Sequence, residues 1–189
     1  MTSDDAMEQY EQEPQPEQKI MQKMIYDYLV HSCFSETAAA FGSACQLINN
    51  DMEVDLSSQD PTSSLEPRKI MSTMIRNGEI KEAVAFCNEN FPGLLGNKTP
   101  ESNEINFILT CQQFIEYARN DASKALMYAQ TELGVFSSIN PKYNDTLQDI
   151  IALIAYPDPA SSPMSHYLSQ DRRESVAISF NNYIICNHC

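Results

Sequence analysis

Apolar residues recur at helical spacing from residue 20 onward, and the first such pattern divides into two short segments. The first segment places five apolar residues on one helix face: Ile20, Met24, Ile25, Tyr28 and Leu29. The second follows Ser35, a residue that suits a helix N-cap, and shares its apolar face among Phe34, Ala38 and Phe41. The pattern therefore predicts a helical hairpin with one apolar face.

A hairpin of roughly 25 residues buries too little apolar surface to offset the entropy lost when its chain is ordered. Its apolar face must therefore be covered by something else. One interpretation is that the rest of this chain packs on it. The other is association with a further polypeptide, most simply a second copy of the same hairpin.

The chain after residue 66 alternates helical patterns with short breaks. Pro67 suits the first turn of a helix, and Asn77–Gly78 supplies a helix C-cap. Further apolar patterns begin near residues 80, 104, 122 and 143, and a last one is formed by Val176, Ala177, Phe180, Tyr183 and Ile184. Prolines 157, 159 and 163 exclude helix between the last two patterns. No segment shows sustained period-two alternation, so we expect an all-α fold of about seven antiparallel helices.

Composition and charge narrow the classes of function. The 189 residues include only five glycines and no GxGxxG or GxxxxGK[ST] motif, which disfavours a phosphate-binding loop. The formal net charge of −14 repels nucleic acid and anionic membrane surfaces, so neither is expected as a partner. Much of the acidity lies in residues 1–17, predicted to be a disordered tail, and in residues 49–65, predicted to be a linker.

The chain lacks both a run of 18 apolar residues and the basic-then-apolar layout of a signal peptide. We therefore expect a cytoplasmic and nuclear location, in which the six cysteines are reduced thiols. Cys186, His188 and Cys189 have the spacing of half a zinc site. Cys45 or another molecule would have to complete it, and because structural zinc normally takes four ligands we expect no metal and no cofactor.

Residues suited to catalysis are sparse. The three histidines, His31, His166 and His188, are far apart in the sequence, and no Ser or Cys lies in a nucleophile-elbow motif. Most carboxylates occur in the two acidic segments or on polar helix faces. The sequence therefore predicts a protein that is not an enzyme and has no catalytic residue.

The hairpin resembles a LisH motif, a helical hairpin that dimerises as a four-helix bundle. The resemblance rests on Tyr28–Leu29, the aromatic at position 34, Thr37–Ala38 and Phe41. The family usually has glycine just before that aromatic, whereas Cys33 stands there in this chain. If the turn requires positive φ, Cys33 costs about 1 kcal/mol relative to glycine.

Two further segments extend the resemblance. Residues 66–95 are similar to the start of a CTLH domain through Arg68, Ile70, Ile75, Gly78, Ile80, Ala83, Pro92, Leu94 and Leu95. A CRA-like motif follows, with Ala155, Tyr156, Asp158, Pro159 and Pro163. This motif and the Gln170-x-x-Arg173–Glu174 pattern resemble the C-terminal half of the Ran-binding protein M branch of the family. The layout is closer to a small scaffold subunit, and a fragment of a larger protein remains an alternative.

The resemblance implies an all-α array of LisH (18–48), CTLH (66–122) and a possibly truncated CRA (123–189). It also implies a function: members of this family are subunits of the GID/CTLH complex, an E3 ubiquitin ligase. A non-catalytic scaffold would join other LisH–CTLH–CRA subunits and RING subunits, as a homodimer or heterodimer, in ubiquitin-dependent proteasomal degradation. In that family picture the CRA end folds back on the LisH region. The alternative is a cytoskeletal, Ran-related or transcriptional adaptor outside the ligase.

Overall fold

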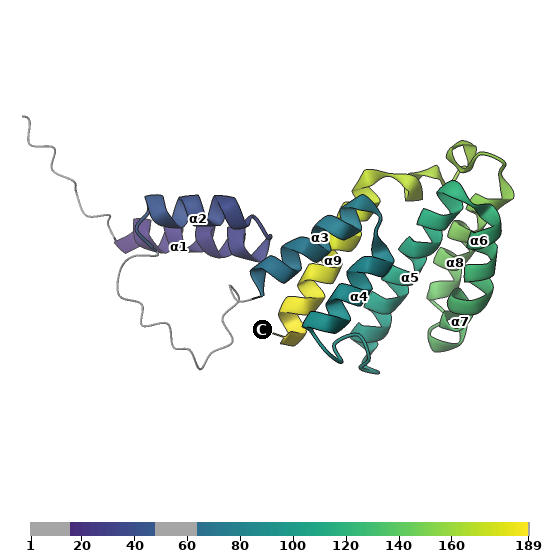
Figure 1. The fold of residues 1–189 in the computed structure, drawn as a ribbon, viewed down its shortest axis with the longest axis horizontal. Coiled ribbons are helices and arrows are strands. Elements are labelled where there is room, and N and C mark those ends of the chain that lie inside the picture. The colour runs from purple at the N-terminus through teal and green to yellow at the C-terminus, as the bar shows by residue number, and fades with distance from the viewer. Residues whose placement is uncertain (1–15, 48–63, 189) are drawn as a thin grey trace, which may run out of the picture. The chain divides into compact units, whose positions relative to one another are not determined.

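The computed structural model describes residues 16–47 and 64–188, so the predicted acidic tail and linker lie almost entirely outside the described residues. The chain divides into two compact units, residues 1–54 and 55–189, and each is described by itself. Every regular element in the described ranges is helical, which confirms the predicted all-α class (Figure 1).

The first unit is the predicted hairpin, formed by α1 (Pro16–His31) and α2 (Ser35–Ala44). Cys33 forms the turn with φ of 62°. Its N–H donates to the Val30 carbonyl at 3.2 Å, and the Phe34 N–H donates to the Leu29 carbonyl at 2.9 Å. This is the Schellman arrangement, in which a left-handed residue satisfies the last carbonyls of a helix.

Two details of the hairpin differ from expectation. The N-cap of α2 is Phe34, so Ser35 is the first helical residue and the prediction of Ser35 as N-cap is wrong by one position. The second helix also ends on a left-handed residue, Gln46, with φ of 55°. Glycine normally occupies such positions because it has no Cβ to crowd the carbonyl. The C-terminal ends of both α1 and α2 therefore carry local backbone strain.

The second unit begins with α3 (Leu65–Asn77) and α4 (Ile80–Asn90). Gly78 ends α3 with φ of 85°, as its predicted C-cap role requires. The last helix, α9 (Gln170–His188), lies along α3 although about a hundred residues separate them in sequence (Figure 1). Met71 and Ile75 of α3 pack with Val176, Phe180 and Ile184 of α9 in one hydrophobic cluster.

The long helix α5 (Pro100–Asn120) joins the two halves of this unit. It begins about four residues before the predicted start near Glu104, because the Thr99 side chain accepts from the Ser102 N–H and Pro100 opens the helix. Ile105 and Leu109 near its start belong to the cluster with α3, α4 and α9. Phe107 and Phe114 belong to a second cluster. The two cores therefore share α5.

The second core lies between α5 and the elements that follow it. These are α6 (Ala122–Tyr128), the π-helical η1 (Ala129–Leu133), α7 (Phe136–Ile139), α8 (Tyr143–Ile151) and η2 (Ala152–Ala155). The rings of Phe107 and Tyr143 stack in this core with centroids 3.9 Å apart. The helix that begins at Ala122 continues directly into the π-helical turn Ala129–Leu133.

The proline-rich segment before α9 also departs from expectation. It was predicted to hold no helix, but it contains the short 3₁₀ turns η3 (Pro159–Ser161) and η4 (Ser165–Leu168). Proline at the first position of a turn removes only an N–H that has no intrahelical partner, which is why η3 tolerates Pro159. None of the described helices is long and apolar enough to cross a membrane.

Candidate protein-interaction site

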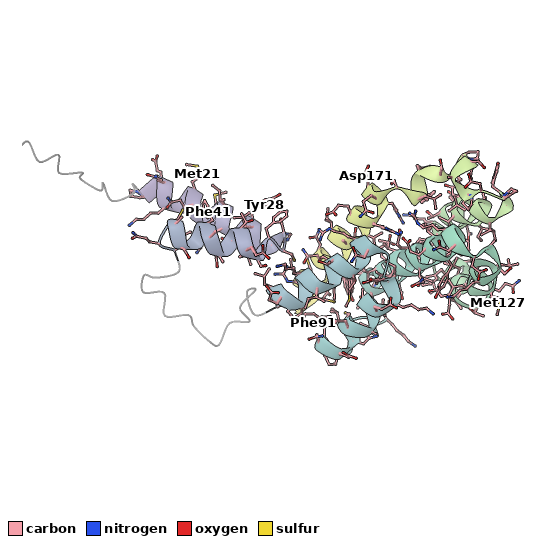
Figure 2. All side chains as sticks on the ribbon, turned by 45° about the horizontal axis from the view of Figure 1, so that its top comes forward. Met21, Tyr28, Phe41, Phe91, Met127 and Asp171 are labelled. Carbon is pink, nitrogen blue, oxygen red and sulfur yellow. The ribbon has the colours of Figure 1, made fainter. Side chains whose placement is uncertain are left out.

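The hairpin exposes apolar side chains that a folded protein normally covers. Met24, Tyr28 and Ile20 are 67 %, 63 % and 61 % exposed. Met21, Phe34 and Ile25 are exposed as well, and Met21 and Tyr28 can be followed along α1 in Figure 2. These six residues, here called the hairpin face, lie within a described stretch of only 32 residues. Such a concentration of uncovered apolar surface is typical of an interaction site.

The eight residues predicted for the LisH interface divide by burial. Five of them are exposed and belong to the hairpin face: Ile20, Met24, Ile25, Tyr28 and Phe34. Leu29 and Phe41 are half-buried, and Ala38 is buried. The sequence pattern did not include Met21, which is 58 % exposed. The interface role of these residues stays a prediction, but the structure shows which of them are accessible to a partner.

Most residues of the predicted CTLH motif are structural. Ile75, Ile80, Ala83, Leu94 and Leu95 are buried in the core with α9. Arg68 donates through Nη1 to Asn181 Oδ1 at 2.8 Å, which connects α3 to α9. Ile70 is 39 % exposed, and Pro92 lies exposed after α4. The motif therefore describes how the first and last helices of the unit pack.

The predicted CRA motif lies on the surface. Ala155, Tyr156, Asp158 and Pro163 are exposed, and Pro159 is half-buried. The Asp158 carboxylate accepts from the Ala160 N–H at 3.0 Å and so caps η3. These residues form the turn that returns the chain from α8 toward α9.

A charged cluster connects α5 with α9. Arg173 donates through Nε and Nη2 to the two carboxylate oxygens of Glu116 at 2.9 and 2.5 Å. Gln112 donates to the same carboxylate at 2.7 Å, and Arg119 lies 3.1 Å from it. Glu116 is 8 % exposed, so this carboxylate is compensated inside the protein rather than by water.

The pKa directions in this cluster follow from its geometry. The hydrogen bonds to Glu116 raise the pKa of Arg173, since they favour its charged form. Burial lowers the pKa of Arg119, and the nearby Glu116 carboxylate opposes that effect. Both guanidinium groups nevertheless stay charged at neutral pH. The cluster thus fixes the position of α9 by charge as well as by packing.

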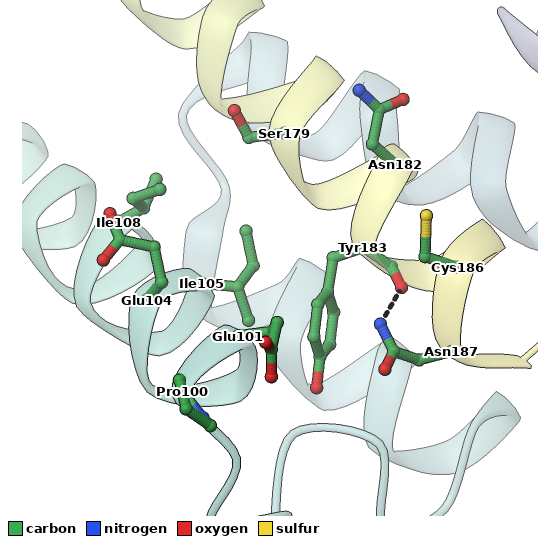
Figure 3. Close-up of a pocket in the computed structure, with 10 residues that line it drawn as sticks. All are labelled: Pro100, Glu101, Glu104, Ile105, Ile108, Ser179, Asn182, Tyr183, Cys186 and Asn187. Atoms are coloured by element: carbon green, nitrogen blue, oxygen red, sulfur yellow. Dashed lines mark hydrogen bonds between the residues drawn. The ribbon is translucent and has the colours of Figure 1, made fainter.

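A groove of about 540 Å³ runs between the start of α5 and the end of α9 (Figure 3). Its lining includes Ile105, Ile108 and Tyr183, with Glu101 and Glu104 on the α5 side. The Tyr183 hydroxyl donates to the Leu94 carbonyl at 2.8 Å, which holds the ring in place. The apolar pattern did not predict this groove, although Thr99 and Pro100 indicate the helix start that forms its α5 side.

The candidate half zinc site falls largely outside the described side chains. Cys186 is exposed, but Cys189 and the side chain of His188 are not among the described residues. Within the described part of the chain, no three His, Cys, Asp or Glu residues are grouped as a metal site would require. Buried Cys87 and Cys111 have thiol pKa values raised by burial, to about 11 and about 12.

Comparison with known proteins places this geometry in a family. The description "CTLH/CRA C-terminal to LisH motif domain" matches residues 65–189. Over 167 residues the chain is 30 % identical to an Arabidopsis thaliana protein named Ran-binding protein M homolog. This covers 86 % of the chain but 35 % of that protein, so the chain spans about a third of its relative's length.

Other relatives are nearer in length. A Dictyostelium discoideum protein named Glucose-induced degradation protein 8 homolog is 27 % identical over 87 % of this chain and 67 % of its own length. A Nematostella vectensis protein of the same name is 26 % identical over 87 % of the chain and 68 % of its length. The family match spans well over half of the sequence, including both cores and the α3–α9 pairing. The chain therefore belongs to the CTLH family, whose domain lies C-terminal to a LisH motif.

Proposed function

We propose that this protein is a non-catalytic scaffold subunit of a GID/CTLH-type E3 ubiquitin ligase complex, present in cytoplasm and nucleus. Its CTLH family membership and its relatives named Glucose-induced degradation protein 8 homolog support membership of such a complex. In this role the chain holds other subunits together, RING-bearing partners carry out ubiquitin transfer, and the products go to proteasomal degradation.

The observation that carries this proposal is the exposed hairpin face. Covering a large apolar side chain is worth about 1.5–3 kcal/mol, so six such residues offer a large driving force for association. Met24 and Tyr28 lie one helical turn apart on α1, and a partner helix can contact both at once. A second hairpin with the same layout supplies such helices and would complete a four-helix bundle.

The hairpin face is tested with charge substitutions at its exposed residues. Met24→Asp and Tyr28→Asp place an uncompensated charge in the proposed contact without altering a buried side chain. Gln18→Asp, at an exposed polar position of the same helix, is the matched control. We expect the first two variants to lose self-association in light scattering, or recovery of ligase subunits, while circular dichroism stays unchanged.

Half-buried Leu29 and Phe41 give a second pair of variants. Leu29→Asp and Phe41→Asp are expected to lose helicity as well as association. Comparison with Met24→Asp and Tyr28→Asp, which should keep their helicity, therefore distinguishes unfolding from loss of contact. An unchanged mass together with intact recovery of partners in Met24→Asp and Tyr28→Asp would refute the proposed role of the hairpin.

The ligase assignment needs a separate experiment in cells. Affinity purification of the tagged chain followed by mass spectrometry is expected to recover RING subunits and other LisH–CTLH–CRA proteins. Recovery of tubulin or chromatin factors in their place would overturn the ligase assignment in favour of a cytoskeletal or transcriptional adaptor. A measured turnover by the purified chain would overturn the non-catalytic role.

A further inference from the structure

The groove between α5 and α9 is formed by two facing helical rows. On α5 the row contains Glu101, Glu104, Ile105 and Ile108, and on α9 it contains Ser179, Asn182, Tyr183 and Cys186. Each row follows the i, i+3, i+4, i+7 spacing that keeps residues on one helix face. The volume of the groove, about 540 Å³, is within the range of sites that hold a ligand or several side chains. Figure 3 shows Ile105 and Glu101 of α5 beside the Tyr183 ring of α9.

The base of the groove is apolar and rigid. Ile105 and Tyr183 are only 3 % and 8 % exposed and belong to the core shared with α3 and α4. Ile108 is partly buried against the same core. Because these side chains are fixed by packing below, the groove is a preformed surface for an apolar side chain.

The electrostatics of the groove favour a positive charge. Glu101 and Glu104 are exposed on its α5 side, and the residues that line it include no Lys or Arg. The Glu104 carboxylate accepts from the Tyr143 hydroxyl at 2.8 Å, which orients it, and neither glutamate forms an ion pair with another described residue.

The charge also argues against the chain's own segments as the occupant. Residues 1–15 and 48–63 together carry nine Asp and Glu residues and no Lys or Arg. A segment of that composition is repelled by Glu101 and Glu104. A basic segment with a large apolar side chain complements both the charge of the two glutamates and the apolar base of the groove.

We propose that the α5–α9 groove binds a basic, amphipathic helical segment of a partner protein. An apolar side chain of that segment packs on Ile105, Ile108 and Tyr183, and a Lys or Arg one turn away pairs with Glu101 and Glu104. This inference rests on the proposed scaffold function, because it specifies the chemistry of one partner contact. It involves the second unit, whereas the hairpin face belongs to the first.

The test uses the full chain and two matched synthetic peptides. Both are 14-residue amphipathic helices with leucines at i, i+3, i+4 and i+7, one with lysines and one with glutamates at the remaining exposed positions. Fluorescence anisotropy at 150 mM salt measures their binding. We expect the lysine peptide to bind and the glutamate peptide to bind at least tenfold more weakly.

Non-specific attraction between a basic peptide and an acidic protein is separated by variants of equal net charge. Glu101→Gln with Glu104→Gln removes two charges at the groove, and Glu89→Gln with Glu132→Gln removes two exposed charges elsewhere. We expect the first double variant to weaken lysine-peptide binding at least fivefold and the second to change it less than twofold. Equal effects from the two double variants would overturn the proposal.

The apolar half of the proposal has its own variant. Asn182→Trp places a bulky ring on the groove wall from an exposed position, and Asn88→Trp does the same on an exposed surface of α4. Binding of the lysine peptide is expected to be lost only in Asn182→Trp, with circular dichroism unchanged in both. Binding that persists in Asn182→Trp would overturn the groove as the site, yet the hairpin variants and the recovery of RING subunits would still decide the scaffold function.

Discussion

Arg173 on α9 and Glu116 on α5 form a two-point ion pair directly over Gly78, the residue that ends α3. A Cβ added at Gly78 would lie 2.7 Å from Arg173 Nη2 and 3.0 Å from Glu116 Oε2. The turn between α3 and α4 is therefore closed by a charged pair from two other helices. Three elements that are distant in sequence meet at this one point.

Removing one partner of the pair is expected to destabilise the second unit strongly. Arg173→Ala leaves the nearly buried Glu116 carboxylate with Arg119 and Gln112 as its partners, so we expect a cost of about 1.5–3 kcal/mol, the range for a lost hydrogen bond to a charged group. Arg173→Lys keeps the charge but cannot reproduce the two-point geometry, so we expect an intermediate loss. Urea unfolding followed by circular dichroism measures both, and equal stability of Arg173→Ala and the parent chain would contradict the role of the pair.

Gly78→Ala should cost more than its backbone conformation alone explains. A non-glycine residue at φ of 85° costs about 1 kcal/mol, and here the methyl group also displaces the Arg173–Glu116 pair. Gly93→Ala is the matched control, since Gly93 has φ of 81° but no atom within 4 Å of an added Cβ. The midpoint of urea unfolding is measured for both variants, and the extra loss in Gly78→Ala is the steric cost of the added methyl group. Equal losses in the two variants would show that the contacts over Gly78 do not matter.

Glycine at either left-handed position of the hairpin is expected to stabilise it. Gln46 is exposed with φ of 55°, so Gln46→Gly relieves backbone strain and loses no buried side chain. We expect a gain of about 0.5–1 kcal/mol, seen as slower hydrogen exchange in α2. Cys33→Gly gains less, because the Cys33 side chain is buried. Faster exchange in Gln46→Gly would show that the left-handed conformation is not retained in solution.

The buried thiols should make stability fall at alkaline pH. Burial raises the pKa of Cys87 to about 11 and of Cys111 to about 12, above the ordinary value near 9. Stability is therefore complete below about pH 9 and declines as the pH rises through the folded pKa values, because the unfolded chain releases these protons first. Urea midpoints from pH 8 to 11 measure the decline, which Cys111→Ala should reduce.

The same burial predicts which thiols react. At pH 8 exposed Cys186 is expected to react with a thiol reagent in the folded chain, whereas Cys87 and Cys111 react only through unfolding. Mass spectrometry of the labelled peptides distinguishes them. Labelling of Cys111 as fast as Cys186 under native conditions would contradict the packing of the second core.

Local signals in the sequence predicted the parts of the fold that depend on neighbouring residues. Gly78 marked the end of α3, and the apolar pattern that begins near residue 122 marked the start of α6, because both signals are set within a few positions. The start of α5 was missed by about four residues since the prediction followed the apolar pattern and overlooked Thr99 and Pro100 as a cap. Helix periodicity also cannot register the π-turn at Ala129–Leu133, which leaves the apolar spacing almost unchanged.

The apolar pattern could not predict contacts between residues that are distant in sequence. Nothing in the surroundings of Glu116 or Arg173 indicates that they pair across 57 positions, and both resemble ordinary charges on a helix face. The groove depends on which rows of α5 and α9 face each other, a property of tertiary packing. Five of the six hairpin-face residues lay in the predicted pattern because their apolar spacing is local, and Met21 did not. The burial of Ala38 and the partial burial of Leu29 and Phe41 became visible only in three dimensions.

The pairing of α9 with α3 has a consequence for biosynthesis. Val176, Phe180 and Ile184 of α9 complete the core around Met71 and Ile75. The second unit therefore cannot finish folding until α9 has left the ribosome. The contacts between α1 and α2 join residues close in sequence, so the hairpin can form while that translation continues. A nascent chain would thus present its apolar hairpin to assembly partners or chaperones before the remainder has folded. A premature stop early in α9 would remove the α9 side of the core and leave α3 its contacts with α4.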